Sequence, residues 1–170
     1  MTQNAYFATG CFWGAERRFW NLPGVVETKV GYMGGTKSEP TYKEVCTGET
    51  GHAEMVKVIF DPSKVSYNQL LQEFWTMHDP TSLNKQGGDI GTQYRSAIFY
   101  TTPEQEALAF NAAKVYGKVL AKEGLGAIVT EINDAKPHKY WLAEEYLQRY
   151  LEKNPNGYDC HSSTGVAYPS

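Results

Sequence analysis

The first thirty residues constrain the fold of this chain more than any other part. Residues 5–9 have the length and composition of a short strand, which ends at Thr9-Gly10. Residues 11–20 follow with aromatic side chains seven positions apart, a spacing typical of one face of a helix. A Pro-Gly pair ends that helix, and alternate residues over 26–32 are typical of a second strand. The chain is therefore predicted to begin with a strand–helix–strand unit.

Two further helices are predicted from their N-terminal signals. Ser66 with Gln69 three residues later is a capping box for a helix that runs to residue 77. Thr102-Pro103 gives the same kind of signal for a helix that ends near residue 124. A last helix is expected over 139–151.

Strands and loops complete the expected architecture. Period-two alternation predicts a strand over 54–60, and further strands are expected over 95–100 and 127–132. Long polar stretches interrupt the alternation of strands and helices at 34–51 and 79–91. We therefore predict an α+β fold: a two-layer sandwich with a mixed β-sheet, helices packed on it, a ferredoxin-like β-α-β core and long ordered loops. At 170 residues the chain fits a single domain, 1–170, with a flexible tail from about residue 154.

Composition narrows the classes of function. The net charge is −3 and the 16 basic residues are scattered, so neither nucleic acid nor an anionic membrane is an expected partner. The first residues have no signal-peptide pattern, and no apolar run is long enough to span a bilayer, so a cytoplasmic protein is expected. Three cysteines do not make a disulfide framework and favour reduced, catalytic or transiently bridged thiols. Nothing suggests a symmetric interface, so a monomer is expected.

Cys11 stands where the first strand becomes a helix. The amides of a first helical turn favour a thiolate, whereas the adjacent Phe12 and Trp13 desolvate it. A cysteine in general is more often a small buried apolar residue than a nucleophile. Glycines at 10 and 14 favour the second role, because they permit close approach of another molecule.

Four other residues could carry chemistry, and each has a plainer interpretation. Glu54 shares an apolar strand face, where it is either a paired core acid or, if unpaired, a neutral proton donor. Tyr42 and Tyr94 could be ordinary half-buried tyrosines, and Asp89 in a Gly-rich turn could be a turn residue. The four histidines lack zinc-site spacing to cysteine and no phosphate-binding loop occurs, so no metal and no other cofactor is expected.

Five blocks in fixed order resemble the class A peptide methionine sulfoxide reductase family, and together they span about residues 5–160. They are Gly10-Cys11-Phe12-Trp13-Gly14; Gly31-Tyr32-Met33-Gly34-Gly35; residues 40–48 leading into Gly51-His52-Ala53-Glu54; Asp89 to Ser96; and Leu151-Glu152-Lys153-Asn154-Pro155. The resemblance implies reduction of methionine-S-sulfoxide, protein-bound or free, as a repair of oxidised protein.

The resemblance also implies a role for each site residue. Cys11 attacks the sulfoxide sulfur, and a neutral Glu54 protonates the oxygen. The hydroxyls of Tyr42 and Tyr94 bind that oxygen. Phe12 and Trp13 hold the substrate methyl group, and Asp89 orients the substrate backbone or neighbouring aromatic rings.

The family's recycling step needs a second thiol to resolve a sulfenic acid on Cys11. Cys160 is the expected resolving residue because the family's resolving cysteines lie in this part of the tail, and Cys46 is expected to be structural. Thioredoxin or a similar dithiol protein would then reopen the Cys11–Cys160 disulfide. Asp159 stands between Tyr158 and Cys160, where the commoner family tail has Cys directly after Gly-Tyr.

Other interpretations remain open on the sequence alone. Leu142 and Leu147 replace the Pro and His that the family usually has in its last helix. A Cys-His hydrolase would use Cys11 with His52 or His161 as base. A binding module for methionine or its sulfoxide would use the aromatic residues without turnover.

Overall fold

A six-stranded mixed sheet forms the centre of the molecule, in the order β7-β6-β1-β3-β2-β8. We describe it from a computed structural model that covers residues 1–159 and 162–169. A separate two-stranded hairpin pairs β4 with β5. The strands are β1 (Gln3–Thr9), β2 (Val25–Met33), β3 (Ala53–Phe60), β4 (Lys85–Gln86), β5 (Asp89–Ile90), β6 (Ser96–Tyr100), β7 (Glu131–Asp134) and β8 (Trp141–Leu142).

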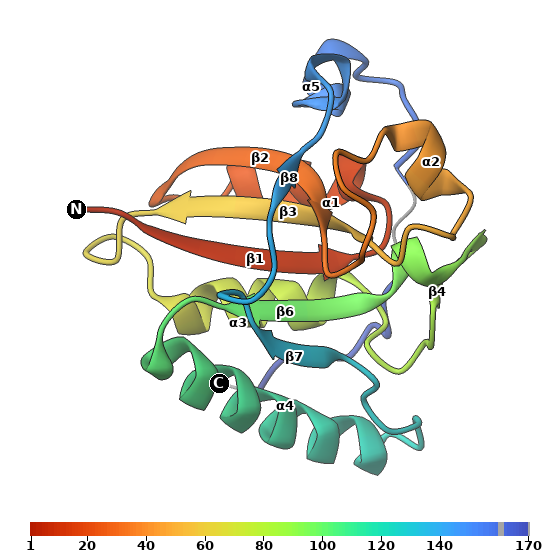
Figure 1. The fold of residues 1–170 in the computed structure, drawn as a ribbon. Coiled ribbons are helices and arrows are strands. Elements are labelled where there is room, and N and C mark those ends of the chain that lie inside the picture. The colour runs from red at the N-terminus through yellow and green to blue at the C-terminus, as the bar shows by residue number, and fades with distance from the viewer. Residues whose placement is uncertain (160–161, 170) are drawn as a thin grey trace.

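The pairing of the four central strands confirms the ferredoxin-like prediction. Strand β3 is antiparallel to both β1 and β2, so β1 and β2 run parallel with β3 between them. Strand β6 is antiparallel to β1, which makes it parallel to β3. Helix α1 (Phe12–Trp20) connects β1 to β2, and helix α3 (Tyr67–Met77) lies between β3 and β6 in the chain. Figure 1 shows these strands side by side.

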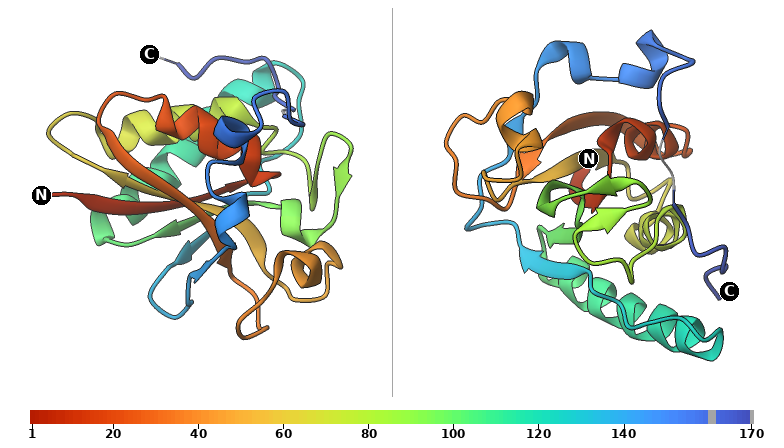
Figure 2. Two further views of the ribbon diagram at one scale, coloured as in Figure 1. Left: turned by 90° about the horizontal axis from the view of Figure 1, so that it is seen from above. Right: turned by 90° about the vertical axis from the view of Figure 1, so that its right-hand side faces the viewer.

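Three helices cover one face of the sheet and form the main core with it. They are α1, α3 and α4 (Pro103–Lys122), which lie together on that face in the left view of Figure 2. Phe7 from β1 stacks on Phe19 of α1 with ring centroids 5.1 Å apart and meets Phe74 of α3 at 5.3 Å. All three rings are completely buried, so each contributes a full aromatic side chain to the apolar area removed from water.

Both predicted helix starts are confirmed. Each helix begins with a cap that residues close in sequence form with one another. The Ser66 hydroxyl accepts a hydrogen bond from the backbone N–H of Gln69, whose side chain in turn accepts one from Ser66 N–H. The Thr102 hydroxyl accepts from Gln105 N–H, and Pro103 occupies the first helical turn.

The predicted helix over 139–151 is wrong. The segment instead contains β8, the 3₁₀ turn η2 (Glu145–Leu147) and the short helix α5 (Tyr150–Lys153). The Gln148 side chain bonds both the N–H and C=O of Val30 and the C=O of Ala143, at 2.8, 2.8 and 3.0 Å. These bonds hold the segment against the edge of β2, where its backbone pairs with the sheet instead of coiling.

Other boundaries also differ from the sequence predictions. The strand expected over 127–132 is displaced to Glu131–Asp134, where it pairs in parallel with β6. The loop expected over 34–51 contains the short helix α2 (Tyr42–Cys46), and the loop over 79–91 contains the β4–β5 hairpin. A 3₁₀ turn, η1 (Thr92–Tyr94), follows that hairpin.

The end of the described chain packs on the helical face. Tyr116 of α4 donates a hydrogen bond to the Val166 carbonyl at 2.6 Å, and its ring stacks on Tyr168 with centroids 5.8 Å apart. In the left view of Figure 2 this segment runs along the helices. Within residues 1–159 and 162–169, no helix combines the length and hydropathy needed to cross a membrane.

Candidate active site

Cys11 occupies the N-cap position of α1, directly after β1 and its turn. Its side chain is a buried thiol, with 8% of the residue exposed. Gly10 makes the turn with φ of +107°, a conformation that L side chains rarely adopt, and a Cβ there would lie 2.8 Å from the Gln86 side chain. As the N-cap residue, Cys11 stands at the start of α1, toward which the N–H groups of the first helical turn point.

Glu54 of β3 reaches this helix start. Its Oε1 accepts a hydrogen bond of 3.0 Å from the backbone N–H of Phe12, the residue next to Cys11. Only 1% of Glu54 is exposed, and its Oε2 is buried without a hydrogen-bond partner among the described residues. The prediction that this acid lies on a buried strand face is thus confirmed.

Burial decides the charge of Glu54. Desolvation raises its pKa from the ordinary 4.5 to about 8, the hydrogen bond from Phe12 N–H opposes the rise, and the negative charge of Asp89 adds to it. Desolvation exceeds the stabilisation that one backbone donor gives a carboxylate. At neutral pH the carboxyl is therefore mostly protonated and can donate a proton from its second oxygen.

Tyr42 and Tyr94 approach the same site from separate elements. Tyr42 begins α2 and its ring lies 6.1 Å from that of Phe12, while Tyr94 ends η1. Burial raises the pKa of both phenols, and nearby Glu54 raises both further. Their hydroxyls therefore stay protonated and can donate hydrogen bonds. Nearby Cys46, the last residue of α2, raises the pKa of the Tyr42 phenol as well.

The two aromatic residues after Cys11 differ in exposure. Phe12 is completely buried, packed between Tyr42 and Tyr32. Trp13 is half-buried, and Tyr150 of α5 stacks on it with centroids 4.0 Å apart and 12° between planes. Trp13 thus offers the accessible aromatic surface beside Cys11, with Phe12 beneath the site.

Asp89 comes from β5, in the separate β4–β5 hairpin. Its Oδ1 accepts a hydrogen bond of 3.4 Å from the Tyr158 hydroxyl, while its buried Oδ2 has no partner among the described residues. Its charge acts on both Glu54 and Tyr94. The structure therefore places Asp89 with the other predicted site residues rather than in a remote turn.

Glu144 is a site residue that the sequence prediction missed. Its carboxylate accepts hydrogen bonds from the Tyr32 hydroxyl at 2.8 Å and from the Tyr42 backbone N–H at 2.9 Å. Gln93 makes a comparable link from η1, donating to the Cys46 carbonyl at 3.2 Å. A capping box at Thr41 and Glu44 begins α2, inside the segment 34–51 that the sequence predicts as a loop.

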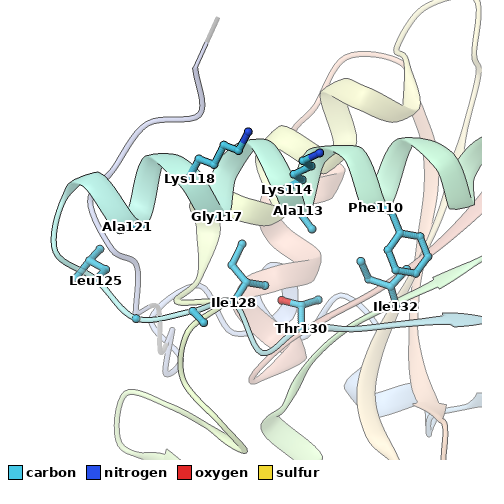
Figure 3. Close-up of a pocket in the computed structure, with 12 residues that line it drawn as sticks. Phe110, Ala113, Lys114, Gly117, Lys118, Ala121, Leu125, Ile128, Thr130 and Ile132 are labelled. Carbon is cyan, nitrogen blue, oxygen red and sulfur yellow. The ribbon is translucent and has the colours of Figure 1, made fainter.

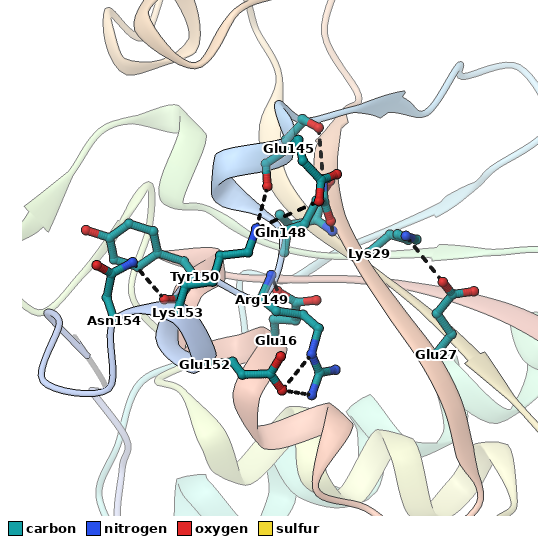
Figure 4. Close-up of polar contacts among 12 residues, drawn as sticks. Glu16, Glu27, Lys29, Glu145, Gln148, Arg149, Tyr150, Glu152, Lys153 and Asn154 are labelled. Carbon is teal, nitrogen blue, oxygen red and sulfur yellow. Dashed lines mark hydrogen bonds and ion pairs between the residues drawn. The ribbon is translucent and has the colours of Figure 1, made fainter.

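A hydrogen bond connects the segment that carries Tyr150 to α1. Figure 4 shows Glu16 of α1 beside Arg149. Glu16, fully buried, accepts hydrogen bonds from the Arg149 N–H at 2.8 Å and the Thr28 hydroxyl at 2.7 Å. The Arg149 guanidinium lies over the Trp20 ring, 4.0 Å from its centroid. These contacts hold the Tyr150 ring on Trp13.

His52 is unsuited to serve as a base for Cys11. Its Nδ1 accepts a hydrogen bond from Gly35 N–H at 3.0 Å and its Nε2 lies 2.7 Å from the Lys37 carbonyl, so both ring nitrogens are bound to backbone groups. The hydrolase interpretation through His52 therefore has no geometric support. His161 and Cys160, the predicted resolving residue, lie outside the described residues.

A groove elsewhere on the surface has different chemistry. It lies between α4 and residues 125–132, has a volume of about 610 Å³, and is lined mainly by apolar side chains such as Ile128 and Phe110 (Figure 3). Lys114 and Lys118 are the charged residues among its described lining residues, none of which is a cysteine or a carboxylate. These lining residues differ in chemistry from those around Cys11.

A buried thiol at a helix start, a neutral acid beside it and two protonated phenols define a cysteine-based site in a ferredoxin-like α+β fold. The sequence model of the family described as "Peptide methionine sulfoxide reductase" matches residues 3–168. The chain therefore belongs to the peptide methionine sulfoxide reductase family.

Individual relatives agree with this assignment. "Peptide methionine sulfoxide reductase MsrA" of Methylococcus capsulatus is 55% identical over 168 residues, covering 99% of this chain and 75% of the relative. The structure of methionine sulfoxide reductase A of Corynebacterium diphtheriae is 46% identical with a TM-score of 0.89, over 99% of this chain and 84% of that one. Mxr1 from Saccharomyces cerevisiae in its reduced form is 36% identical with a TM-score of 0.83, over 95% and 92%. A structure of Mxr1 in complex with Trx2 shares the fold.

Proposed function

We propose that this enzyme reduces methionine-S-sulfoxide, in proteins and as the free amino acid, by thiol chemistry at Cys11. The Cys11 sulfur attacks the sulfoxide sulfur while Glu54 protonates the sulfoxide oxygen. The oxygen passes to Cys11 as a sulfenic acid, the thiol proton replaces the one that Glu54 gave up, and methionine leaves. Two electrons move from the cysteine sulfur to the methionine sulfur, so no other reductant enters this step.

The observation that carries this proposal is the position of the Glu54 carboxyl. One oxygen is fixed by the N–H of Phe12, adjacent to the nucleophile, and the other is buried and unpartnered among the described residues. An unpartnered buried carboxyl is costly unless it is neutral. A substrate oxygen at Oε2 would give it a partner and accept its proton, which explains why the fold keeps such a group beside a thiol.

Tyr42 and Tyr94 would stabilise the same oxygen as charge develops on it. Both phenols stay protonated, and they come from elements separate from the one that holds Glu54. Donors fixed in place before reaction stabilise a developing charge without reorganisation. In this scheme Trp13, supported from beneath by the buried Phe12, holds the substrate methyl group, which selects the S epimer, and Asp89 orients the substrate backbone.

Recycling of the sulfenic acid is assigned to Cys160. Its thiol sulfur would attack the Cys11 sulfur, forming a disulfide and releasing the oxygen as water. A thioredoxin-type dithiol would then reduce that disulfide, and the complex of the relative Mxr1 with Trx2 supports this choice. A thiol cycle of this kind suits the cytoplasm, where thiols are kept reduced. We therefore propose a cytoplasmic location, which cell fractionation would test.

Reduction of each epimer of a dabsylated methionine sulfoxide tests the proposal. The parent and Cys160→Ser are compared, with dithiothreitol or with thioredoxin as reductant. We expect turnover of the S epimer only, and about one methionine per enzyme from Cys160→Ser with thioredoxin, because the cycle stops at the sulfenic acid. If neither epimer is reduced, the reductase function is wrong, and a binding module takes its place.

A further inference from the structure

Asp159 is tied to the nucleophile helix by two arginines. Its carboxylate forms ion pairs with Arg17 and with Arg18, the latter with Nη1 3.2 Å from Oδ1. The Asp159 side chain is only 20% exposed, and the arginine side chains are 35% and 30% exposed. Two partly buried partners on one carboxylate make a better-defined contact than a single exposed pair.

The contact lies close to Cys11 along α1. Asp159 Oδ1 occupies the space where a Cβ would stand if Gly14 were any other residue. Gly14 follows Cys11 by three positions, so the two lie on one face of the helix, about 4.5 Å apart along its axis. The carboxylate is therefore seated about one helical turn from the nucleophile, in a notch that the missing side chain leaves open.

The electrostatics favour a charged Asp159 in this notch. Burial raises the pKa of this carboxyl, and the charges and hydrogen bonds of Arg18 and Arg17 lower it by more, so the net shift is downward. The carboxylate is thus ionised throughout the neutral range. Arg18 also donates to the Gly14 carbonyl at 3.2 Å, which holds its guanidinium over the notch.

Asp159 is joined by one peptide bond to Cys160. We propose that Asp159 is a positioning residue for the recycling step: its ion pairs with Arg17 and Arg18 fix the chain directly before the resolving cysteine one turn from Cys11. The inference rests on the proposed function, since it needs Cys160 as the resolving thiol. The Asp159 carboxylate is engaged by Arg17 and Arg18, so its role in this proposal is to position the chain and not to react.

The ion pairs of Asp159, which we call the anchor, should speed disulfide formation. The Cys160 sulfur bonds to the Cys11 sulfur, the S–O bond of the sulfenic acid breaks, and the oxygen leaves as water with the thiol proton. Holding one reactant near the other converts part of a search over tail conformations into a short local motion. The anchor has no comparable effect on the first step, because methionine formation needs no tail thiol.

Rapid-quench assays on Asp159→Asn separate the two steps. Asparagine keeps the shape but removes the charge. The single-turnover rate of methionine formation should match the parent, while Cys11–Cys160 disulfide formation slows about three- to tenfold, as expected for a partly buried ion pair. Glu27→Gln, which removes an equal charge from an exposed pair with Lys29, is the matched control and should change neither rate.

Salt and a second variant distinguish positioning from a structural role. Because salt screens a partly buried ion pair only in part, the parent's disulfide rate in about 0.5 M salt should fall part of the way toward that of Asp159→Asn, whose own rate should stay flat. Arg17→Gln/Arg18→Gln should slow the same step, and adding Asp159→Asn to it should have no further effect.

The outcomes separate this inference from the function on which it rests. If Cys160→Ser still recycles with thioredoxin, the resolving role of Cys160 is wrong, and the inference falls with it. If Cys160→Ser stops after one methionine but Asp159→Asn forms its disulfide at the parent's rate with the parent's salt dependence, the positioning role alone is overturned.

Discussion

At the scale of single residues, the site depends on how two opposed effects on one carboxyl balance. The N–H of Phe12 favours ionised Glu54, and burial favours the neutral form. Burial prevails, so a residue that would ordinarily be a base at pH 7 becomes an acid there. The same desolvation keeps the phenols of Tyr42 and Tyr94 protonated, which leaves three proton or hydrogen-bond donors around the thiol.

The two phenols are expected to act mainly in the transition state. Tyr42→Phe and Tyr94→Phe should each lower kcat about tenfold and change KM little, because each removes one hydrogen bond to an oxygen whose charge grows as the reaction proceeds. Steady-state kinetics with dithiothreitol measures both constants. Tyr146→Phe is the control, since Tyr146 is 59% exposed, and it should behave as the parent. Equal loss in all three variants would contradict a specific role for the phenols.

The stability of the protein should report the protonation of Glu54. A carboxyl whose pKa is higher folded than unfolded binds its proton more tightly in the folded state. Its stabilising contribution is therefore complete below its ordinary pKa of 4.5 and is lost as pH rises through about 8. Urea unfolding of the parent should lose about 2 to 3 kcal/mol from this group between pH 6 and 9.

Glu54→Gln removes the titrating group and serves as the comparison. Its free energy of unfolding should lack that decrease, keeping only what other groups, such as the buried Glu16, contribute to both proteins. Parallel curves for the two proteins would mean that Glu54 is already ionised at neutral pH in the folded state.

At the scale of elements, local signals explain which parts of the fold could be predicted. The helices at 66 and 102 have caps made within four residues of sequence, so the pattern alone was sufficient. The prediction of a helix over 139–151 is wrong because Gln148 is bound to Val30, 118 residues away, and no local sequence pattern indicates that pairing. These tertiary contacts outweigh the helix propensity of the segment.

The same reasoning applies to the site. Cys11 was a candidate because a strand-to-helix switch is visible in the sequence, and Glu54 because it interrupts an apolar strand face, but their roles came from the family resemblance. Glu144 could not, since its two hydrogen bonds reach residues 32 and 42 from a segment whose own structure was mispredicted.

Gln148 provides a test of how the segment after β8 supports the site. Gln148→Ala removes three buried hydrogen bonds and should cost about 2 to 4 kcal/mol of unfolding free energy. It should also raise KM for the sulfoxide, because Tyr150 loses its support over Trp13. Urea unfolding and steady-state kinetics measure the two effects.

Gln105→Ala is the matched control for this variant. Gln105 is equally buried and bonds the backbone of Thr101 and Asn4, away from the site. It should lower stability but leave KM unchanged. A KM that rises equally in both variants would mean that general destabilisation, not the local support of Tyr150, is responsible.

At the scale of the whole molecule, the ferredoxin-like order brings residues distant in sequence to one end of the sheet. Cys11 follows β1, Glu54 lies near the start of β3, and Tyr94 precedes β6. Strands β1 and β3 are antiparallel neighbours, as are β1 and β6, so the end of β1 lies beside the beginnings of the other two. The topology thus assembles a nucleophile, an acid and a hydrogen-bond donor without requiring any long loop to carry all three.

The most direct test of the central claim is the pH dependence of single-turnover methionine formation in the parent and in Glu54→Gln. With Glu54 as the acid, the parent's rate falls as pH rises above about 8. The variant should be about 10²- to 10³-fold slower at pH 7 and should lack that decline. A variant that forms methionine within twofold of the parent's rate at pH 7 would contradict the assignment of Glu54 as the proton donor to the sulfoxide oxygen.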